Sequence, residues 1–129
     1  MSSTIWIKLV HIAGDGCRMR LLVVEDDPTV RRLIEVTVRG LGDVVVVGSE
    51  QDARLELLGQ PDVVLLDLGL PHLRWDLLEE AVQAAARVVV VTGHIEPSVI
   101  SRALQMGAAD VVTKPFRPAT LVAAASGDG

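Results

Sequence analysis

Five short apolar runs constrain the fold of this 129-residue chain more than any other feature of its sequence. Each run is rich in valine or leucine, spans three or four residues and does not alternate with polar residues. Such runs are typical of strands that are buried on both faces of a parallel sheet. The expected strands are Leu21–Val24, Val44–Val47, Val63–Leu66, Val88–Val91 and Val111–Thr113.

Helical periodicity fills the intervals between these runs. Apolar residues recur at three- and four-residue steps from Pro28 to Leu41, where Pro28 suits a first helical turn. Similar stripes follow the third and fourth runs, and shorter helices are expected at residues 51–58 and 118–125. The alternation predicts an α/β fold, a doubly wound (βα)5 domain with a five-stranded parallel sheet. For the strands we expect the flavodoxin-like order 2-1-3-4-5.

The domain organisation follows from the same pattern. One domain is expected over residues 19–125, with a disordered N-terminal extension at residues 1–18 and a disordered tail at residues 126–129. The segment Thr4–Ala13 is apolar but interrupted by Lys8, so it makes a poor signal peptide. An upstream start codon is an alternative origin for this extension.

Composition excludes several classes of protein. The net charge of −5 without a basic cluster disfavours direct binding of nucleic acid. The single cysteine, Cys17, allows no intrachain disulfide and fits a reducing compartment. No apolar run approaches the roughly 18 residues that span a bilayer, so we expect a cytoplasmic protein that does not enter a membrane.

Polar side chains useful in phosphate chemistry follow four of the five expected strands. In an open parallel sheet, functional groups gather at the carboxyl ends of the strands, where the strand order reverses. The residues are Glu25, Asp26 and Asp27 after the first strand, Asp67 after the third, Thr92 after the fourth and Lys114 after the fifth.

These residue types indicate a magnesium-dependent phosphoacceptor. Clustered carboxylates repel one another unless a cation joins them, and Glu25, Asp26 and Asp67 suit Mg²⁺. A carboxylate can attack a phosphoryl group, whose charge Lys114 and the Thr92 hydroxyl can then stabilise. The chain has ten arginines but only two lysines, so the lysine directly after the last strand is interpreted as functional rather than as a chance surface charge.

Structural roles compete with this interpretation at each position. Asp27 before Pro28 is interpreted as a helix N-cap. Taken alone, Asp67 could be an ordinary turn acid, Thr92 a turn residue and Lys114 a surface charge. His72 and His94 are interpreted as exposed loop residues, and Trp75 as a packing or interaction residue.

Four motifs together resemble the receiver domain of two-component response regulators, including stand-alone chemotaxis-type receivers. The resemblance covers residues 19–121, nearly the whole domain. The four motifs are Leu-Leu-Val-Val-Glu25-Asp26-Asp27-Pro28, Val-Val-Leu-Leu-Asp67-Leu-Gly-Leu-Pro71, Val90-Val91-Thr92-Gly93 and Gly107-Ala-Ala-Asp-Val-Val-Thr-Lys114-Pro115-Phe116.

The resemblance implies a role for each residue of these motifs. Glu25, Asp26, Asp67 and the backbone carbonyl of Gly69 would hold Mg²⁺. Asp67 would take a phosphoryl group from the phosphohistidine of a histidine kinase or phosphotransfer protein. Thr92 and Lys114 would then bind that group, and the Lys114–Pro115 peptide is usually cis in such domains. Such a protein is no enzyme beyond self-catalysed phosphoryl transfer and autodephosphorylation.

The resemblance also implies changed contacts with a downstream protein and a homodimer through the fourth and fifth helices. The chain departs from the family pattern at two places that bear on this switching. Arg74-Trp75 replaces the usual Asp-Gly, and Val111 replaces the usual aromatic switch residue. A degenerate receiver that acts as a phosphorylation-independent protein-interaction module is therefore the alternative function.

Two further alternatives stay open. A phosphatase of the haloacid dehalogenase type also uses an aspartate at a strand end, but it needs a second aspartate where this chain has Gly69. The chain could also be a fragment of a larger, DNA-binding regulator.

Overall fold

A single parallel sheet forms the centre of the protein. The computed structural model describes residues 18–69, 73–85 and 87–127. The strand order is β2-β1-β3-β4-β5, which confirms the expected fold class and strand order. The strands are β1 (Met19–Val24), β2 (Gly42–Val47), β3 (Val63–Leu66), β4 (Arg87–Thr92) and β5 (Asp110–Thr113).

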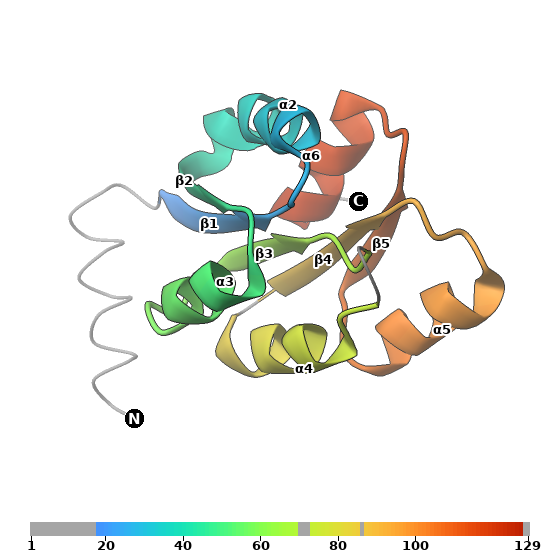
Figure 1. Ribbon diagram of the computed structural model, residues 1–129. Helices are drawn as coiled ribbons and strands as arrows, with labels where there is room; N and C mark the ends of the chain where they lie inside the picture. The colour runs from blue at the N-terminus through green and yellow to red at the C-terminus, as the bar shows by residue number, and fades with distance from the viewer. Residues whose placement is uncertain (1–17, 70–72, 86, 128–129) are drawn as a thin grey trace.

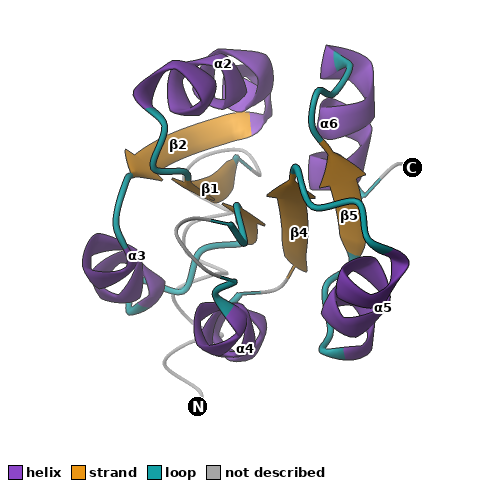
Figure 2. Cartoon of the chain, turned by 45° about the vertical axis from the view of Figure 1, so that its right-hand side comes forward, coloured by secondary structure: helices purple, strands orange, loops and turns teal. Residues whose placement is uncertain are grey.

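Helices cover both faces of this sheet, as Figures 1 and 2 show. One face carries α2 (Pro28–Val38) and α6 (Pro118–Ser126). The other face carries α3 (Glu50–Leu57), α4 (Trp75–Ala84) and α5 (Pro97–Gln105).

The first predicted helix ends earlier than expected. It was predicted to reach Leu41, but α2 ends at Val38 and residues Arg39–Leu41 form the 3-10 turn η1. A tighter last turn is a common way for a helix to satisfy its final carbonyl groups. The chain must also turn sharply here, because Gly42 packs directly against the backbone of Met19 as β2 begins.

Alternate residues of the strands build two separate apolar layers. Leu22, Val64 and Val90 face α3, α4 and α5, whereas Leu21 and Val23 face α2 and α6. Strands buried on both faces explain why the five runs show no polar alternation.

Helix starts are set by local signals. Oδ1 of Asp27 accepts hydrogen bonds from the backbone N–H groups of Thr29 and Val30, at 2.9 and 3.1 Å, which confirms its N-cap role. The hydroxyl of Ser49 accepts from the N–H of Asp52 in the same way. These caps place both helices directly after the carboxyl ends of β1 and β2.

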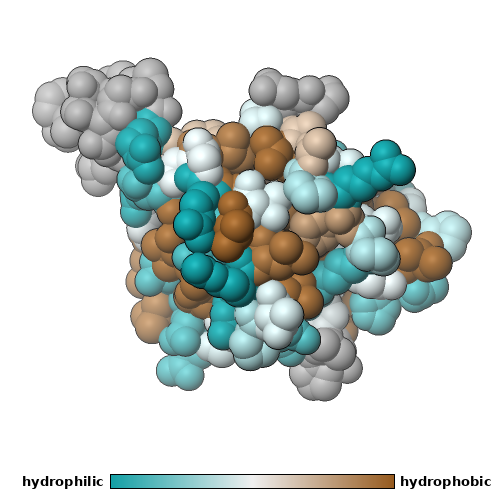
Figure 3. Space-filling view, turned by 90° about the horizontal axis from the view of Figure 1, so that it is seen from above, coloured by the Kyte–Doolittle hydropathy of each residue, from teal (hydrophilic) through white to brown (hydrophobic). Residues whose placement is uncertain are grey.

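The outer surface of the α2 and α6 layer is mixed in character. Figure 3 looks onto this side and shows hydrophobic groups scattered between hydrophilic ones. Two apolar residues of α2 are exposed here, Leu33 and Val36.

The expected disordered ends fall largely outside the described residues, which exclude residues 1–17 and 128–129. At the C-terminus, α6 includes Ser126, and Gly127 caps it with a φ of +84°. None of the described helices is both long enough and apolar enough to cross a bilayer.

Candidate phosphoacceptor site

Three carboxylates meet where β1 and β3 end. The backbone N–H of Asp67 donates to the carbonyl of Val24 at 3.0 Å, so the chain leaves both strands at the same edge of the sheet. One oxygen from each of Glu25, Asp26 and Asp67 lies within 4.8 Å of the others. We call these three residues the acid pocket.

Lys114 reaches into the acid pocket from the end of β5. Its Nζ lies 2.7 Å from Oε1 of Glu25 and 3.4 Å from Oδ2 of Asp67. Both carboxylates are buried. The peptide bond that follows Lys114 is cis, as the resemblance implies. The structure thus brings together the acids and the lysine that the sequence analysis singled out.

Burial raises the pKa of Glu25 above its ordinary value. Loss of solvent is the largest cause, and the nearby charge of Asp67 acts in the same direction. The hydrogen bond from Lys114 and the backbone N–H of Asp27 oppose this rise. Burial and the neighbouring carboxylate therefore both disfavour the ionised form of Glu25.

The donor set fits a hard divalent cation. Oδ1 of Asp26 is buried and finds no hydrogen-bond partner among the described residues. Such an orphaned acceptor beside two further carboxylates is the arrangement that a cation would satisfy. Carboxylate oxygens with room for water and phosphate oxygens suit Mg²⁺.

Gly69 and His94 border the acid pocket. The N–H of Gly69 donates to Oδ1 of Asp67 at 3.0 Å, which holds this carboxylate in place. A β-carbon at Gly69 would come within 3.3 Å of Nε2 of His94, so the imidazole lies beside the glycine. The role of the Gly69 carbonyl as a metal ligand stays a prediction.

Thr92 lies at the end of β4, between β3 and β5 in the sheet. Its side chain is fully buried, and its hydroxyl accepts a hydrogen bond from the N–H of His94 at 3.0 Å. The carbonyl of Thr92 accepts from the N–H of Lys114, which aligns the two segments. Its contact with a phosphoryl group also stays a prediction.

Several contacts around the site carry no signal in the sequence. Arg31 donates to the backbone carbonyl of Glu25 at 3.0 Å and so braces the acidic segment. Nε of the buried Arg74 lies 3.7 Å from Oε2 of Glu50 on α3. The guanidinium of Arg102 on α5 lies 4.3 Å from the centre of the Trp75 ring.

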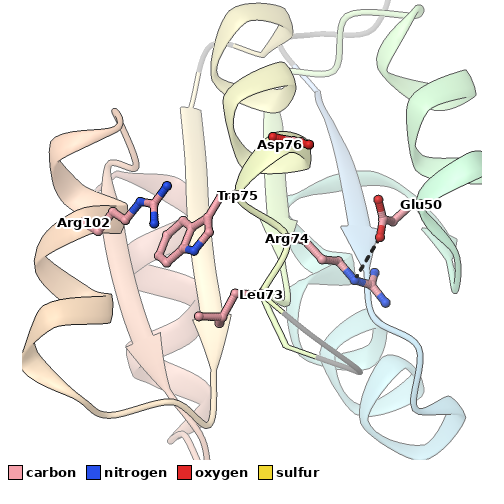
Figure 4. Close-up of a pocket in the computed structure, with 6 residues that line it drawn as sticks. All are labelled: Glu50, Leu73, Arg74, Trp75, Asp76 and Arg102. Atoms are coloured by element: carbon pink, nitrogen blue, oxygen red, sulfur yellow. Dashed lines mark ion pairs between the residues drawn. The ribbon is translucent and has the colours of Figure 1, made fainter.

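Figure 4 shows Glu50, Arg74, Trp75 and Arg102 around a pocket beside the start of α4, whose volume is about 240 Å³. At the family's aromatic position, the partly buried Val111 pairs with Val90 in the sheet and packs against the α3–α5 side of the core.

Comparisons with known proteins agree with this geometry. Residues 21–126 match the family described as the response regulator receiver domain. The chain is 36% identical over 113 residues to the DNA-binding response regulator MtrA of Mycolicibacterium smegmatis. The aligned region covers 84% of this chain and 50% of MtrA. It is also 36% identical over 115 residues to the transcriptional regulatory protein AruR of Pseudomonas aeruginosa, and that alignment covers 82% of this chain and 47% of AruR. The chain therefore spans about half the length of these curated relatives.

Solved structures show the same fold. A beryllofluoride-activated receiver domain, DrrB, has a TM-score of 0.74 and 25% identity, covering 82% of this chain and 92% of that one. The chemotaxis response regulator CheY4 of Vibrio cholerae has a TM-score of 0.71 at 20% identity, and the superposition covers 81% of this chain and 93% of CheY4. The family match, supported by the strand order and the acid pocket, places the chain in the response regulator receiver family, the receiver domains of two-component signalling.

Proposed function

We propose that the protein is a Mg²⁺-dependent phosphoacceptor in which Asp67 takes a phosphoryl group from the phosphohistidine of a histidine kinase or phosphotransfer protein. The observation that carries this proposal is the position of Lys114, whose ammonium lies between Glu25 and Asp67. Burying two carboxylates beside one lysine, with an orphaned oxygen on Asp26, lowers the stability of the fold. Stability alone therefore does not explain this arrangement. It matches what phosphoryl transfer to a carboxylate requires.

In the proposed reaction, a carboxylate oxygen of Asp67 bonds to phosphorus while the phosphorus–nitrogen bond of the donor breaks. The bonding pair stays on the leaving imidazole nitrogen, and the product is an acyl phosphate. Lys114 neutralises charge on the phosphoryl oxygens, and the hydroxyl of Thr92 donates to one of them. Glu25 and Asp26, with Asp67 and the Gly69 carbonyl, would hold Mg²⁺. The bound ion would supply further positive charge to the transferred group.

Phosphoryl uptake from a small phosphodonor tests the proposal. Acetyl phosphate is added to the full chain with and without Mg²⁺, and intact mass reports the transfer. Asp67→Ala should abolish uptake, whereas Asp52→Ala, which removes an exposed acid in the first turn of α3, should leave it unchanged. Equal uptake in the parent chain and in Asp67→Ala would contradict the assignment of Asp67.

The partners and setting belong to the same proposal. We propose a cytoplasmic protein whose phosphorylation changes its contacts with a downstream protein, with a homodimer through the fourth and fifth helices, here α5 and α6. Exposed Ile95 and Leu104, before and within α5, support a contact surface there. The relatives MtrA and AruR are named as a DNA-binding response regulator and a transcriptional regulatory protein, and both are about twice as long as this chain.

A phosphorylation-independent interaction module is the second candidate function. The observation that favours it is Val111, because no aromatic side chain stands at the family's switch position. In that case beryllofluoride with Mg²⁺ should leave the amide spectrum of the protein unchanged. A spectral change that requires Asp67 would instead support the phosphoacceptor.

A further inference from the structure

We propose that Trp75 and Arg102 relay the state of the acid pocket to helix α5, in place of the aromatic residue that the chain lacks at Val111. This inference rests on the proposed function, because it needs a phosphoryl group or its analogue at Asp67. Trp75 and Arg102 are therefore positioning residues rather than members of the reacting site.

The first link of the relay joins Asp67 to the start of α4. Leu68 follows Asp67 directly and is completely buried. Its carbonyl accepts a hydrogen bond from the N–H of Arg74 at 3.0 Å, which ties the two ends of the loop together. A displacement of Leu68 therefore reaches Arg74 through this hydrogen bond.

The second link joins the start of α4 to its neighbours on both sides. Arg74 lies against Glu50 of α3, while Trp75 stacks on Arg102 of α5, as Figure 4 shows. The following turn of α4 is fixed by the buried Leu77 and Leu78. Because these residues anchor the helix body, we expect a shift of Leu68 to be taken up at Arg74 and Trp75.

Helix α5 is the element best able to respond. Ala103 is its one buried residue, so few apolar contacts hold it to the sheet. Its first residue, Pro97, follows the fully buried Thr92 by a four-residue connection. Arg102 lies near its other end. The segment that follows Thr92 thus leads into one end of this helix, and Trp75 contacts the helix near its other end.

The distribution of aromatic residues supports the same assignment. The chain has one phenylalanine, two tryptophans and no tyrosine. Phe116 packs on the opposite layer of the core, with α2 and α6. Within the described residues, Trp75 is therefore the aromatic side chain on the face that α3, α4 and α5 cover. Its stacking on a guanidinium is a directional contact that a small shift of either partner weakens.

Fluorescence of Trp75 tests the relay in the full chain. Trp6→Phe leaves Trp75 as the single tryptophan, and its emission is followed as Mg²⁺ and then beryllofluoride are added. Fluorine NMR of the bound beryllofluoride and the mass gain from acetyl phosphate report occupancy of Asp67 independently. Arg102→Gln and Arg102→Lys are made in this background, with Arg39→Gln as the matched control at an exposed arginine at the end of α2.

The relay predicts a change in Trp75 emission on binding of beryllofluoride that is absent in Asp67→Ala. Arg102→Gln should lose this change while occupancy of Asp67 is retained, and Arg102→Lys, which keeps a cation over the ring, should recover part of it. Arg39→Gln should respond like the parent chain. Hydrogen exchange in α5 should change on activation in the parent and not in Arg102→Gln.

Three results would overturn the relay, and they differ in what they say about the proposed function. Occupied Asp67 with unchanged Trp75 emission, or an unaltered response in Arg102→Gln, would exclude the relay and leave the proposed function standing. Failure of Asp67 to take either beryllofluoride or a phosphoryl group would remove both proposals together.

Discussion

The ammonium of Lys114 donates a hydrogen bond to Oε1 of Glu25 at 2.7 Å, although 89 positions separate the two residues in the chain. The side chain of Glu25 is 1% exposed, and that of Lys114 is 23% exposed. The buried carboxylate is therefore paired with an ammonium group that solvent still reaches, and it also accepts a hydrogen bond from the backbone N–H of Asp27. The stability of the protein and the chemistry of its site are coupled at this contact.

Lys114→Met should destabilise the protein at neutral pH when no divalent cation is added. The change removes the ammonium that lies beside the buried carboxylates of Glu25 and Asp67, which we expect to cost about 1–3 kcal/mol. Urea unfolding measures this loss, and Mg²⁺ should restore more stability to the variant than to the parent. Arg32→Gln, which removes the exposed pair with Glu35, should change stability by no more than about 0.5 kcal/mol. Equal losses in the two variants would contradict this role of Lys114.

The raised pKa of Glu25 predicts opposite pH responses for stability and metal binding. In the folded protein this group keeps its proton above the ordinary value of 4.5. Its contribution to stability is therefore fully present below 4.5 and is lost as the pH rises through the raised pKa. Mg²⁺ should bind more tightly over the same rise, because binding needs the ionised carboxylate.

The comparison that isolates this effect is with Glu25→Gln. Unfolding curves without metal, followed from acid to neutral pH, should show the parent chain losing stability relative to this variant. A parent chain that gains stability relative to Glu25→Gln over that range would show that the direction assigned to this pKa is wrong.

Asp26→Ala should change stability and metal affinity in opposite directions. Oδ1 of Asp26 is buried without a partner among the described residues, beside two further acids. Its removal should stabilise the metal-free protein by about 1 kcal/mol. The same change should weaken Mg²⁺ binding at least about tenfold, or about 1.4 kcal/mol. Calorimetric titration and urea unfolding measure the two effects. Asp27→Ala should instead lower stability, because it removes the N-cap of α2.

Gly107→Ala should destabilise the fold away from the acid pocket. Gly107 has a φ of +115°, and a β-carbon there would come within 2.8 Å of Cγ1 of Val82. We expect a loss of about 1–3 kcal/mol from backbone strain and overpacking. Gly40→Ala is the matched control, since a β-carbon at that position meets nothing within 4 Å. Thermal unfolding that shifts equally in both variants would refute the strain argument.

The sequence by itself determined the elements and their order. Valine-rich runs without alternation indicate buried parallel strands, and each of the five lies within an observed strand. Asp27 was recognisable as an N-cap because capping depends on residues two and three positions away. The acid pocket was also predictable, because the polar residues stand directly after the strands and the carboxyl ends of parallel strands share one edge.

Only the tertiary structure decided which side chains touch across elements. The early end of α2 at Val38 depends on where β2 begins beside β1. The pair of Arg74 with Glu50 and the stacking of Trp75 on Arg102 depend on how helices lie against one another. The raised pKa of Glu25 likewise depends on its burial and on the positions of Lys114 and Asp67. Periodicity and capping are local in the chain, whereas contact, burial and electrostatic coupling depend on distances in space, which sequence spacing does not specify.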